Sequence, residues 1–234
     1  MSDIEYLKKY YKGNLDQALI ELKKGIPVQY IVGNVDFYGI ELKVNSNVLI
    51  PRFETEELVS KVIDYAKDFE NPRIVDVGTG SGAIAIALKK KIKCDMVATD
   101  ISLKALEVAK DNALTNNVAI EFKDGNLLEP LTGKFDIIVS NPPYIAYDEE
   151  IMDIVKNNEP HIALYASNNG LYYYEEILKN VSKYLNEKYL IAFEIGDSQG
   201  KIIKALVKKF LNVDAIIEKD MQGRDRFIFI KKTN

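Results

Sequence analysis

The tetrapeptide Asn141-Pro142-Pro143-Tyr144 carries the side chains of this sequence that are best suited to chemistry. It follows the apolar run 135–139, which predicts a buried strand, so an amide and a tyrosine ring emerge where that strand ends. In open α/β sheets, ligands bind beyond the carboxyl ends of the strands. We therefore hypothesise that the tetrapeptide holds a planar amide or amine beside a bound cofactor.

A glycine-rich loop joins the first strand of the predicted sheet to a helix. The residues of this loop that are suited to contact a cofactor are Asp76, Gly78, Thr79, Gly80, Ser81 and Gly82. Glycines allow a ligand to approach the backbone, and a helix N-terminus presents unpaired amide groups. Gly78, Gly80 and Ala83 also satisfy the relaxed dinucleotide fingerprint. A carboxylate at Asp76 suits an amino-acid moiety and a cationic sulfonium better than a pyrophosphate, which favours S-adenosylmethionine over a nicotinamide cofactor.

Two further positions are suited to the adenosine part of either cofactor. Asp100 closes the second predicted strand, with Ile101 after it, and its carboxylate can accept hydrogen bonds from both ribose hydroxyls. After the third strand, Asn126 can accept a hydrogen bond from the adenine amine, and Leu127 can cover the ring. A simple turn explains residues 124–128 almost equally well.

Composition narrows the class of protein. The chain has 234 residues, 47% of them apolar, which fits one domain of ordinary size with a small appendage. A formal net charge of −4 disfavours a nucleic-acid substrate. The single Cys94 and single His161 exclude a thiol and imidazole cluster of the structural zinc type, and we expect no metal. No secretory leader and no run of roughly 20 apolar residues is present, so we expect a cytoplasmic protein without membrane contact.

The chain before residue 51 is predicted to form two small units. Apolar residues at helical spacing predict helices at 3–12 and 15–24, the second capped by Asn14 and ended by Gly25. Short β-rich pieces then predict a hairpin, with strands at 35–38, 40–44 and 48–49. We therefore divide the chain into a helical segment at 1–26, a hairpin linker at 27–50 and a main domain at 51–234.

The main domain begins with a helix that runs from about Pro51 to Phe69. Glu54 and Glu56 lie in its first turn, where they either complement the helix dipole or line the pocket. Strands and helices then alternate. The predicted strands are 74–77, 96–99, 119–122, 135–139, 189–194, 214–217 and 227–230. The predicted helices are 82–91, 102–116, 170–186 and 198–210, with Ser102 and Ser198 as N-caps.

This alternation predicts an α/β fold with a mostly parallel, seven-stranded sheet covered on both faces. The last two strands are too close for a crossover helix and predict an antiparallel hairpin. Such an ending is typical of class I S-adenosylmethionine-dependent methyltransferases, which have a Rossmann-like fold. Residues 145–169 give few secondary-structure signals and predict a long loop that contributes to a substrate cleft, with His161 in a structural role.

In order along the chain, the motifs resemble those of the peptide chain release factor glutamine methyltransferases over roughly residues 27–230. The matching residues are Pro51-Arg52-Phe53-Glu54-Thr55-Glu56, Asp76 to Gly82, Asn141-Pro142-Pro143-Tyr144, Glu159-Pro160, Ala163-Leu164, Gly170-Leu171, Tyr174, Glu194-Ile195-Gly196, Gln199, Asp220, Gly223 and Arg226.

The resemblance implies methyl transfer from S-adenosylmethionine to the side-chain amide nitrogen of the glutamine in the Gly-Gly-Gln motif of class 1 release factors. In that reaction the Asn141 oxygen and the Pro142 carbonyl would accept hydrogen bonds from the amide NH2. Pro143 would stiffen the backbone, and Tyr144 would pack against the amide. Asn141 would also lie beside the cofactor. No covalent intermediate and no metal is needed.

The sequence departs from the family in two places. Asn126 stands where an acidic residue is usual, and the N-terminal helical region is shorter than the usual multi-helix domain. Three other functions remain open. The tetrapeptide also occurs in adenine-amine methyltransferases of nucleic acid, which would need a basic track for the strand. The others are a non-catalytic adenosylmethionine-binding scaffold and, remotely, a dehydrogenase.

Overall fold

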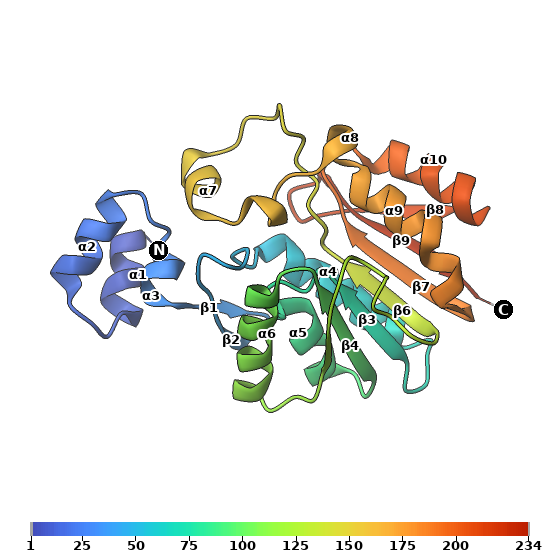
Figure 1. Ribbon diagram of the computed structural model, residues 1–234, viewed down its shortest axis with the longest axis horizontal. Coiled ribbons are helices and arrows are strands. Elements are labelled where there is room, and N and C mark those ends of the chain that lie inside the picture. Colours follow the sequence, from blue (N-terminus) through green and yellow to red (C-terminus); the bar gives the residue numbers. More distant parts are fainter. Residues whose placement is uncertain (1, 234) are drawn as a thin grey trace.

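Figure 1 shows a computed structural model that describes residues 2–233, with a seven-stranded sheet between two layers of helices and a small helical bundle at one side. The strands of the sheet are β3 (Arg73–Val77), β4 (Asp95–Asp100), β5 (Glu121–Asp124), β6 (Phe135–Ser140), β7 (Leu185–Glu194), β8 (Ala215–Lys219) and β9 (Asp225–Lys232). Their order is β5-β4-β3-β6-β7-β9-β8, and β9 runs antiparallel to both of its neighbours. The predicted sheet and its terminal hairpin are therefore confirmed.

Successive side chains of each strand point to opposite faces, and this alternation builds two apolar layers. On β3, for example, Ile74 packs with one layer and Val75 with the other. The first layer is covered by α4 (Phe53–Ala66), α5 (Ala83–Lys91) and α6 (Leu103–Thr115). The second is covered by α9 (Tyr172–Asn180) and α10 (Gly200–Leu211). Each fully buried aliphatic side chain contributes roughly 1.5–3 kcal/mol to the free energy of unfolding. The two layers therefore hold the strands in this order and fix where their carboxyl ends meet.

The N-terminal bundle consists of α1 (Asp3–Tyr10), α2 (Leu15–Lys23) and α3 (Val28–Val32). Asn14 caps α2 as predicted, because its side chain accepts hydrogen bonds from the first-turn amides. The sequence analysis missed α3, which begins after Pro27 and ends at Gly33, where φ is 85°. Its β-branched residues favour a strand locally, but Val28 and Ile31 pack on α1 and α2 instead.

A two-stranded hairpin connects this bundle to the main sheet. Strands β1 (Asn34–Phe37) and β2 (Ile40–Lys43) pair antiparallel. Both loop residues have positive φ, 51° at Tyr38 and 75° at Gly39, as hairpin loops of two residues require. The predicted third strand at 48–49 is wrong, because the Val48 carbonyl accepts a hydrogen bond from the Tyr30 hydroxyl at 2.6 Å instead of pairing with a strand. The boundaries at residues 26 and 50 remain our proposal for the domain division.

Residues 145–169, which we call the α7 segment, were predicted as a loop, and about half of them lie in short helices. They contain α7 (Asp153–Asn158), η1 (His161–Ala163) and the start of α8 (Ser167–Gly170). Buried Glu159 fixes the segment by accepting hydrogen bonds from the Ile50 backbone N–H and from Arg52. These contacts are more than 100 residues apart in sequence, so no local pattern announces them.

Three predicted helix ends also differ from the structure. The helix expected over 170–186 ends at Asn180, and after η2 (Val181–Tyr184) the chain already enters β7. The helix expected to reach Phe69 ends at Ala66. The predicted N-cap Ser198 is wrong, because Gln199 occupies that position. Within residues 2–233, no helix combines the length and the hydropathy needed to cross a membrane.

Candidate active site

Asp100 and the glycine-rich loop meet at the carboxyl edge of the sheet. One oxygen of the Asp100 carboxylate accepts a hydrogen bond from the Gly80 N–H at 2.8 Å, and the other accepts one from the Ser102 N–H at 2.9 Å. Burial raises the pKa of Asp100, although these backbone donors act in the opposite direction. The carboxylate is thereby held in one orientation, with lone pairs left for hydroxyl groups of a ligand.

Asp76 is fully buried near the end of β3, two residues before Gly78. Its Oδ2 accepts hydrogen bonds from the Thr79 hydroxyl at 2.6 Å and the Ala85 N–H at 3.2 Å. Its Oδ1 is the one buried side-chain atom in residues 2–233 that lacks a hydrogen-bond partner. Burial raises the pKa of Asp76 to about 7. An unpartnered buried carboxylate oxygen fits a positively charged donor brought by a ligand.

A cavity, which we call the main cavity, opens beside these residues. Of the residues singled out from the sequence, it is lined by Gly78, Gly80, Asp100, Ile101, Asn126, Leu127, Pro142 and Pro143. Its other walls include Ile162 and Ala163, from the 145–169 segment that was predicted to contribute to a substrate cleft, and Leu49 and Tyr173, which had no predicted role at the site. A mostly apolar cavity with a few convergent polar groups is the usual form of a cofactor site.

Four of the predicted loop residues do not line the main cavity: Asp76, which is fully buried and lines none of the described cavities, and Thr79, Ser81 and Gly82. Thr79 and Ser81 line a smaller cavity together with Asn141. Gly82 lines none of these cavities and instead lets α5 approach α6, because a Cβ there would lie 3.3 Å from the Cβ of Ala109. The loop therefore combines residues that face a ligand with residues that pack the helices.

Asn126 and Leu127 form the far wall of the main cavity. The Asn126 amide donates to Glu129 at 3.4 Å, which leaves its carbonyl oxygen without a partner among the described contacts. Leu127 has φ of 50°, a strained conformation for a residue with a side chain, and its carbonyl accepts a hydrogen bond from the Thr99 hydroxyl at 3.1 Å. Strain of this kind is often found where a backbone is shaped around a ligand.

A chain of hydrogen-bonded polar side chains supports the tetrapeptide. The Asn141 amide donates to the Thr55 hydroxyl at 3.1 Å, and that hydroxyl donates to Glu194 Oε2 at 2.7 Å. The Tyr144 hydroxyl donates to the other oxygen of Glu194 at 3.4 Å. One buried carboxylate therefore supports both ends of the tetrapeptide.

The backbone of the tetrapeptide is fixed by residues from the other side of the sheet. The Gln199 amide donates to the Tyr144 carbonyl at 2.9 Å. Gly170 lies so close that a Cβ on it would come within 2.1 Å of the same carbonyl oxygen. The Tyr174 hydroxyl donates to the Glu194 carbonyl at 2.8 Å. Motif residues that are scattered along the sequence thus meet under Tyr144.

The electrostatics of this support depend on burial. Burial raises the pKa of Glu194 to about 7, opposed by the Thr55 hydrogen bond and by the Arg226 guanidinium. Burial and the negative charge of Glu194 raise the pKa of Tyr144 well above its ordinary value. Tyr144 is therefore neutral at physiological pH, and Glu194 titrates near it.

A second cavity, which we call the side cavity, lies behind the tetrapeptide. It is lined by Arg52, Asn141, Pro142, Tyr144, Glu194 and four residues of the α7 segment. Pro142 lines both the side cavity and the main cavity, so it forms part of the wall between them. This arrangement places the tetrapeptide at the junction of two spaces that two reactants can occupy.

The sequence analysis missed Thr55 as a site residue. It left open whether Glu54 and Glu56 line the pocket, and the structure shows neither of them lining a described cavity; buried Thr55 between them lines the smaller one. The sequence offered one indication of Thr55, which is a polar residue in the first turn of the helix that follows Pro51-Arg52.

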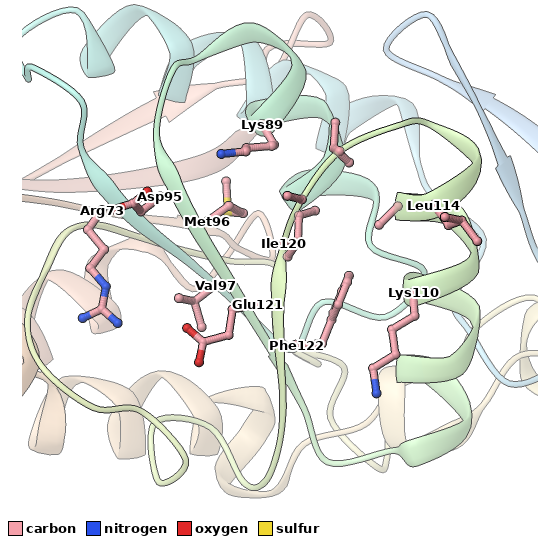
Figure 2. A pocket seen from close by; sticks show the side chains of 13 residues that line it. Arg73, Lys89, Asp95, Met96, Val97, Lys110, Leu114, Ile120, Glu121 and Phe122 are labelled. Carbon is pink, nitrogen blue, oxygen red and sulfur yellow. The ribbon is translucent and has the colours of Figure 1, made fainter.

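A larger hollow, of about 740 Å³, lies elsewhere. Figure 2 shows its lining, which includes Arg73 and Asp95 at the beginnings of β3 and β4, with Lys89 and Lys110 from α5 and α6. It contains none of the predicted site residues. Since ligands of such sheets bind at the opposite, carboxyl ends of the strands, it is not the candidate site. The part of the chain that the structure describes also contains no cluster of three or more histidine, cysteine or acidic residues arranged to hold a metal.

Comparison with known proteins identifies close relatives. Residues 42–159 match the family described as Methyltransferase small domain. The chain is 40% identical to the release factor glutamine methyltransferase of Fusobacterium nucleatum over 97% of this chain and 66% of that protein. It is 42% identical to the enzyme of the same name from Lactococcus lactis, over 93% of this chain and 82% of that protein. The chain thus spans about two thirds to four fifths of the length of these relatives.

Solved structures agree on the fold. A release factor-specific protein-(glutamine-N5) methyltransferase of Alicyclobacillus acidocaldarius superposes with a TM-score of 0.51 at 24% identity, over 82% of this chain and 100% of that one. A 16S rRNA methyltransferase of T. thermophilus, determined with AdoMet and guanosine, superposes with a TM-score of 0.61 at 16% identity, over 86% of this chain and 50% of that one. At such low identity these likenesses establish the class I methyltransferase fold.

Proposed function

The chain belongs to the release factor glutamine methyltransferase family, and from this premise we propose that it transfers a methyl group from S-adenosylmethionine to the glutamine side-chain amide nitrogen of the Gly-Gly-Gln motif in class 1 release factors. The observation that carries the proposal is the position of Pro142 between the main cavity and the side cavity. A methyl donor bound in the main cavity and a methyl acceptor bound in the side cavity would meet at the tetrapeptide.

The residues that line the main cavity, together with buried Asp76, which does not line it, fit S-adenosylmethionine. The unpartnered, buried Oδ1 of Asp76 suits the ammonium group of its amino-acid part, and the fixed carboxylate of Asp100 suits the ribose hydroxyls. The free carbonyl of Asn126 suits the adenine amine, with Ile101 and Leu127 as apolar walls. When bound, this cofactor supplies an electrophilic methyl group on a sulfonium and leaves as a neutral thioether.

The amide nitrogen that accepts the methyl group needs to be oriented more than it needs a general base. An amide nitrogen is a poor nucleophile, because its lone pair is delocalised into the carbonyl, and its proton becomes acidic only as the new N–C bond forms. Asn141 Oδ1 and the Pro142 carbonyl can each accept one hydrogen bond from the NH2 group. These two acceptors stabilise the positive charge that develops on nitrogen and point its lone pair at the methyl carbon.

Tyr144 completes the acceptor site. Its ring is about half-buried, and its hydroxyl and carbonyl are held by Glu194 and Gln199, so the ring is fixed where a flat amide can pack against it. Its raised pKa keeps the phenol protonated, so its hydroxyl remains a hydrogen-bond donor to Glu194. After transfer, the surplus proton of the amide passes to solvent.

Incubation with labelled S-adenosylmethionine and a class 1 release factor tests the proposal. We expect label on the wild-type release factor and none on a variant whose motif glutamine is replaced by asparagine. Equal labelling of both, or of neither, would refute it.

We further infer that the partner is this protein substrate and not nucleic acid, and that the enzyme works in the cytoplasm where release factors act. The inference on nucleic acid is supported by the net charge of −4. Salt-sensitive, tight binding of DNA or RNA would instead favour methylation of an adenine amine.

A further inference from the structure

We propose that Thr55, itself held by Glu194, is a positioning residue that fixes which way the Asn141 side-chain amide faces. This inference rests on the proposed function, since it concerns how the acceptor amide is received. It follows from the direction of two consecutive hydrogen bonds.

The Thr55 hydroxyl has one proton to donate. Its side chain lies in the first turn of α4 and is 4% exposed, and Glu194 and Asn141 are the hydrogen-bond partners that the structure gives its hydroxyl. Glu194 Oε2 lies 2.7 Å away and, when ionised, can only accept. The hydroxyl must therefore donate to Glu194, which leaves its lone pairs to accept from Asn141 at 3.1 Å. Only the NH2 end of the Asn141 amide can donate there.

The consequence for Asn141 is a defined orientation. The two ends of an asparagine amide have nearly the same shape, and hydrogen bonding alone distinguishes them. Within residues 2–233, Thr55 is the one hydrogen-bond partner of the Asn141 side chain. With its NH2 group turned to Thr55, Asn141 presents Oδ1, an acceptor, on its other side. The opposite orientation would present NH2 to the NH2 of the substrate, which cannot form a hydrogen bond.

Glu194 thus sets the direction of the whole chain of bonds. The groups that face it are Thr55 and Glu54 on α4, Tyr144 after β6, Tyr174 on α9 and Arg226 on β9. Burial raises its pKa to about 7 against the opposing effect of Arg226. Once protonated, Glu194 can donate to Thr55, and the Thr55 hydroxyl is then free to donate to Asn141 Oδ1. The ionised form, which predominates above about pH 7, therefore enforces the correct amide orientation, whereas the protonated form also permits the reversed one.

The hydrogen-bond chain can be tested in the enzyme alone, without substrate. Thr55→Val keeps the side-chain shape and removes the hydroxyl, whereas Thr55→Ser keeps the hydroxyl and is the matched control. In ¹⁵N NMR spectra at pH 8, the Asn141 NH2 signals are identified by their loss in Asn141→Ala. We expect their hydrogen exchange to be about 10-fold faster in Thr55→Val than in wild type or Thr55→Ser. Unchanged exchange in Thr55→Val would overturn the proposal.

Activity on the release factor supplies the second readout. We expect Thr55→Val to lower kcat by about 10- to 100-fold while the Kd for S-adenosylmethionine changes less than about twofold, and Thr55→Ser to stay within about threefold of wild type. An equal loss of kcat in both variants, or no loss in Thr55→Val, would contradict the positioning role. Thermal unfolding of both variants shows whether a loss of kcat reflects a loss of fold.

The pH profile tests the role of Glu194. We expect kcat of the wild type to fall as the pH drops below about 7, and Glu194→Gln to lack this fall, because glutamine does not ionise. Persistence of the fall in Glu194→Gln would assign it to another group and overturn this part. If the wild type does not methylate a release factor at all, the proposed function fails, whereas the NMR result still decides whether Thr55 orients Asn141.

Discussion

Replacing Asp76 by asparagine is expected to make the stability of the ligand-free protein less dependent on pH. The carboxylate is fully buried near the end of β3, and one of its oxygens has no hydrogen-bond partner. Its ionised form is therefore poorly solvated in the fold and well solvated in the unfolded chain. Asparagine has nearly the same shape and does not ionise, so it removes this difference between the two states.

The magnitude follows from the two pKa values of Asp76. Its ordinary value is 3.8, and burial raises the pKa in the fold to about 7. The folded protein thus binds this proton more tightly than the unfolded chain. This tighter proton binding stabilises the fold fully below the ordinary pKa of 3.8, and the stabilisation is lost as the pH rises through the raised pKa of about 7. The difference corresponds to about 4 kcal/mol in total, of which roughly 2.5 kcal/mol falls between pH 5 and 8.

Urea unfolding followed by circular dichroism at pH 5 and pH 8 measures this contribution. The free energy of unfolding of Asp76→Asn, minus that of wild type, should rise by about 2.5 kcal/mol between the two pH values. Asp95→Asn, which alters an exposed carboxylate at the start of β4, is the matched control. A difference that is the same at both pH values within about 0.5 kcal/mol would refute the reasoning.

Three further substitutions test other parts of the site. Asn141→Ala should lower kcat by about 100- to 1,000-fold and leave the Kd for S-adenosylmethionine within about threefold, as measured by single-turnover assays and calorimetry. Gly170→Ala would bring a Cβ within 2.1 Å of the Tyr144 carbonyl and should cost about 3 kcal/mol in urea unfolding. The control Gly223→Ala, also at positive φ but with nothing within 4 Å, should cost only about 1 kcal/mol; equal costs would argue against the contact. Glu159→Gln should speed proteolysis of the α7 segment about 10-fold, and unchanged cleavage would show that this carboxylate does not anchor it.

The sheet could be predicted because its signals are local. Most strands of the main sheet are short apolar runs, and the crossover helices follow at the spacing that a parallel sheet requires. The exception is β5, which contains two acidic residues and a lysine and begins two residues later than the predicted strand at 119–122. The positions of Asp76, Asp100 and Asn141 at strand ends followed directly, since the carboxyl ends of parallel strands share one edge. Hydrophobic periodicity thus predicted where these three side chains lie in the fold.

The supports of the tetrapeptide could not be predicted in the same way. Thr55 and Glu194 are 139 residues apart, and Gln199 and Tyr144 are 55 residues apart. Their pairing depends on how α4 and α10 pack on opposite faces of the sheet, which no pattern within one segment encodes. The resemblance drew attention to these residues and assigned them no contacts.

Helices α7 and α3 were missed for a related reason. Both are short and have weak intrinsic helical signals, so they form because their surroundings hold them. Glu159 and Asn158 attach the α7 segment to the 50–52 region and to the Gly25 carbonyl, respectively. Tertiary contacts of this kind outweigh local propensity.

The place of β9 between β7 and β8 has a consequence for synthesis on the ribosome. The glycine-rich loop and Asp100 emerge early and have their strand partners, β3, β4 and β6, soon after translation. β9 must instead insert between two strands that are made before it, and the guanidinium of Arg226 on β9 donates to the Ile195 carbonyl beside Glu194. The cofactor side of the candidate site can therefore assemble during synthesis before the Glu194 side, which is complete only when β9 has inserted.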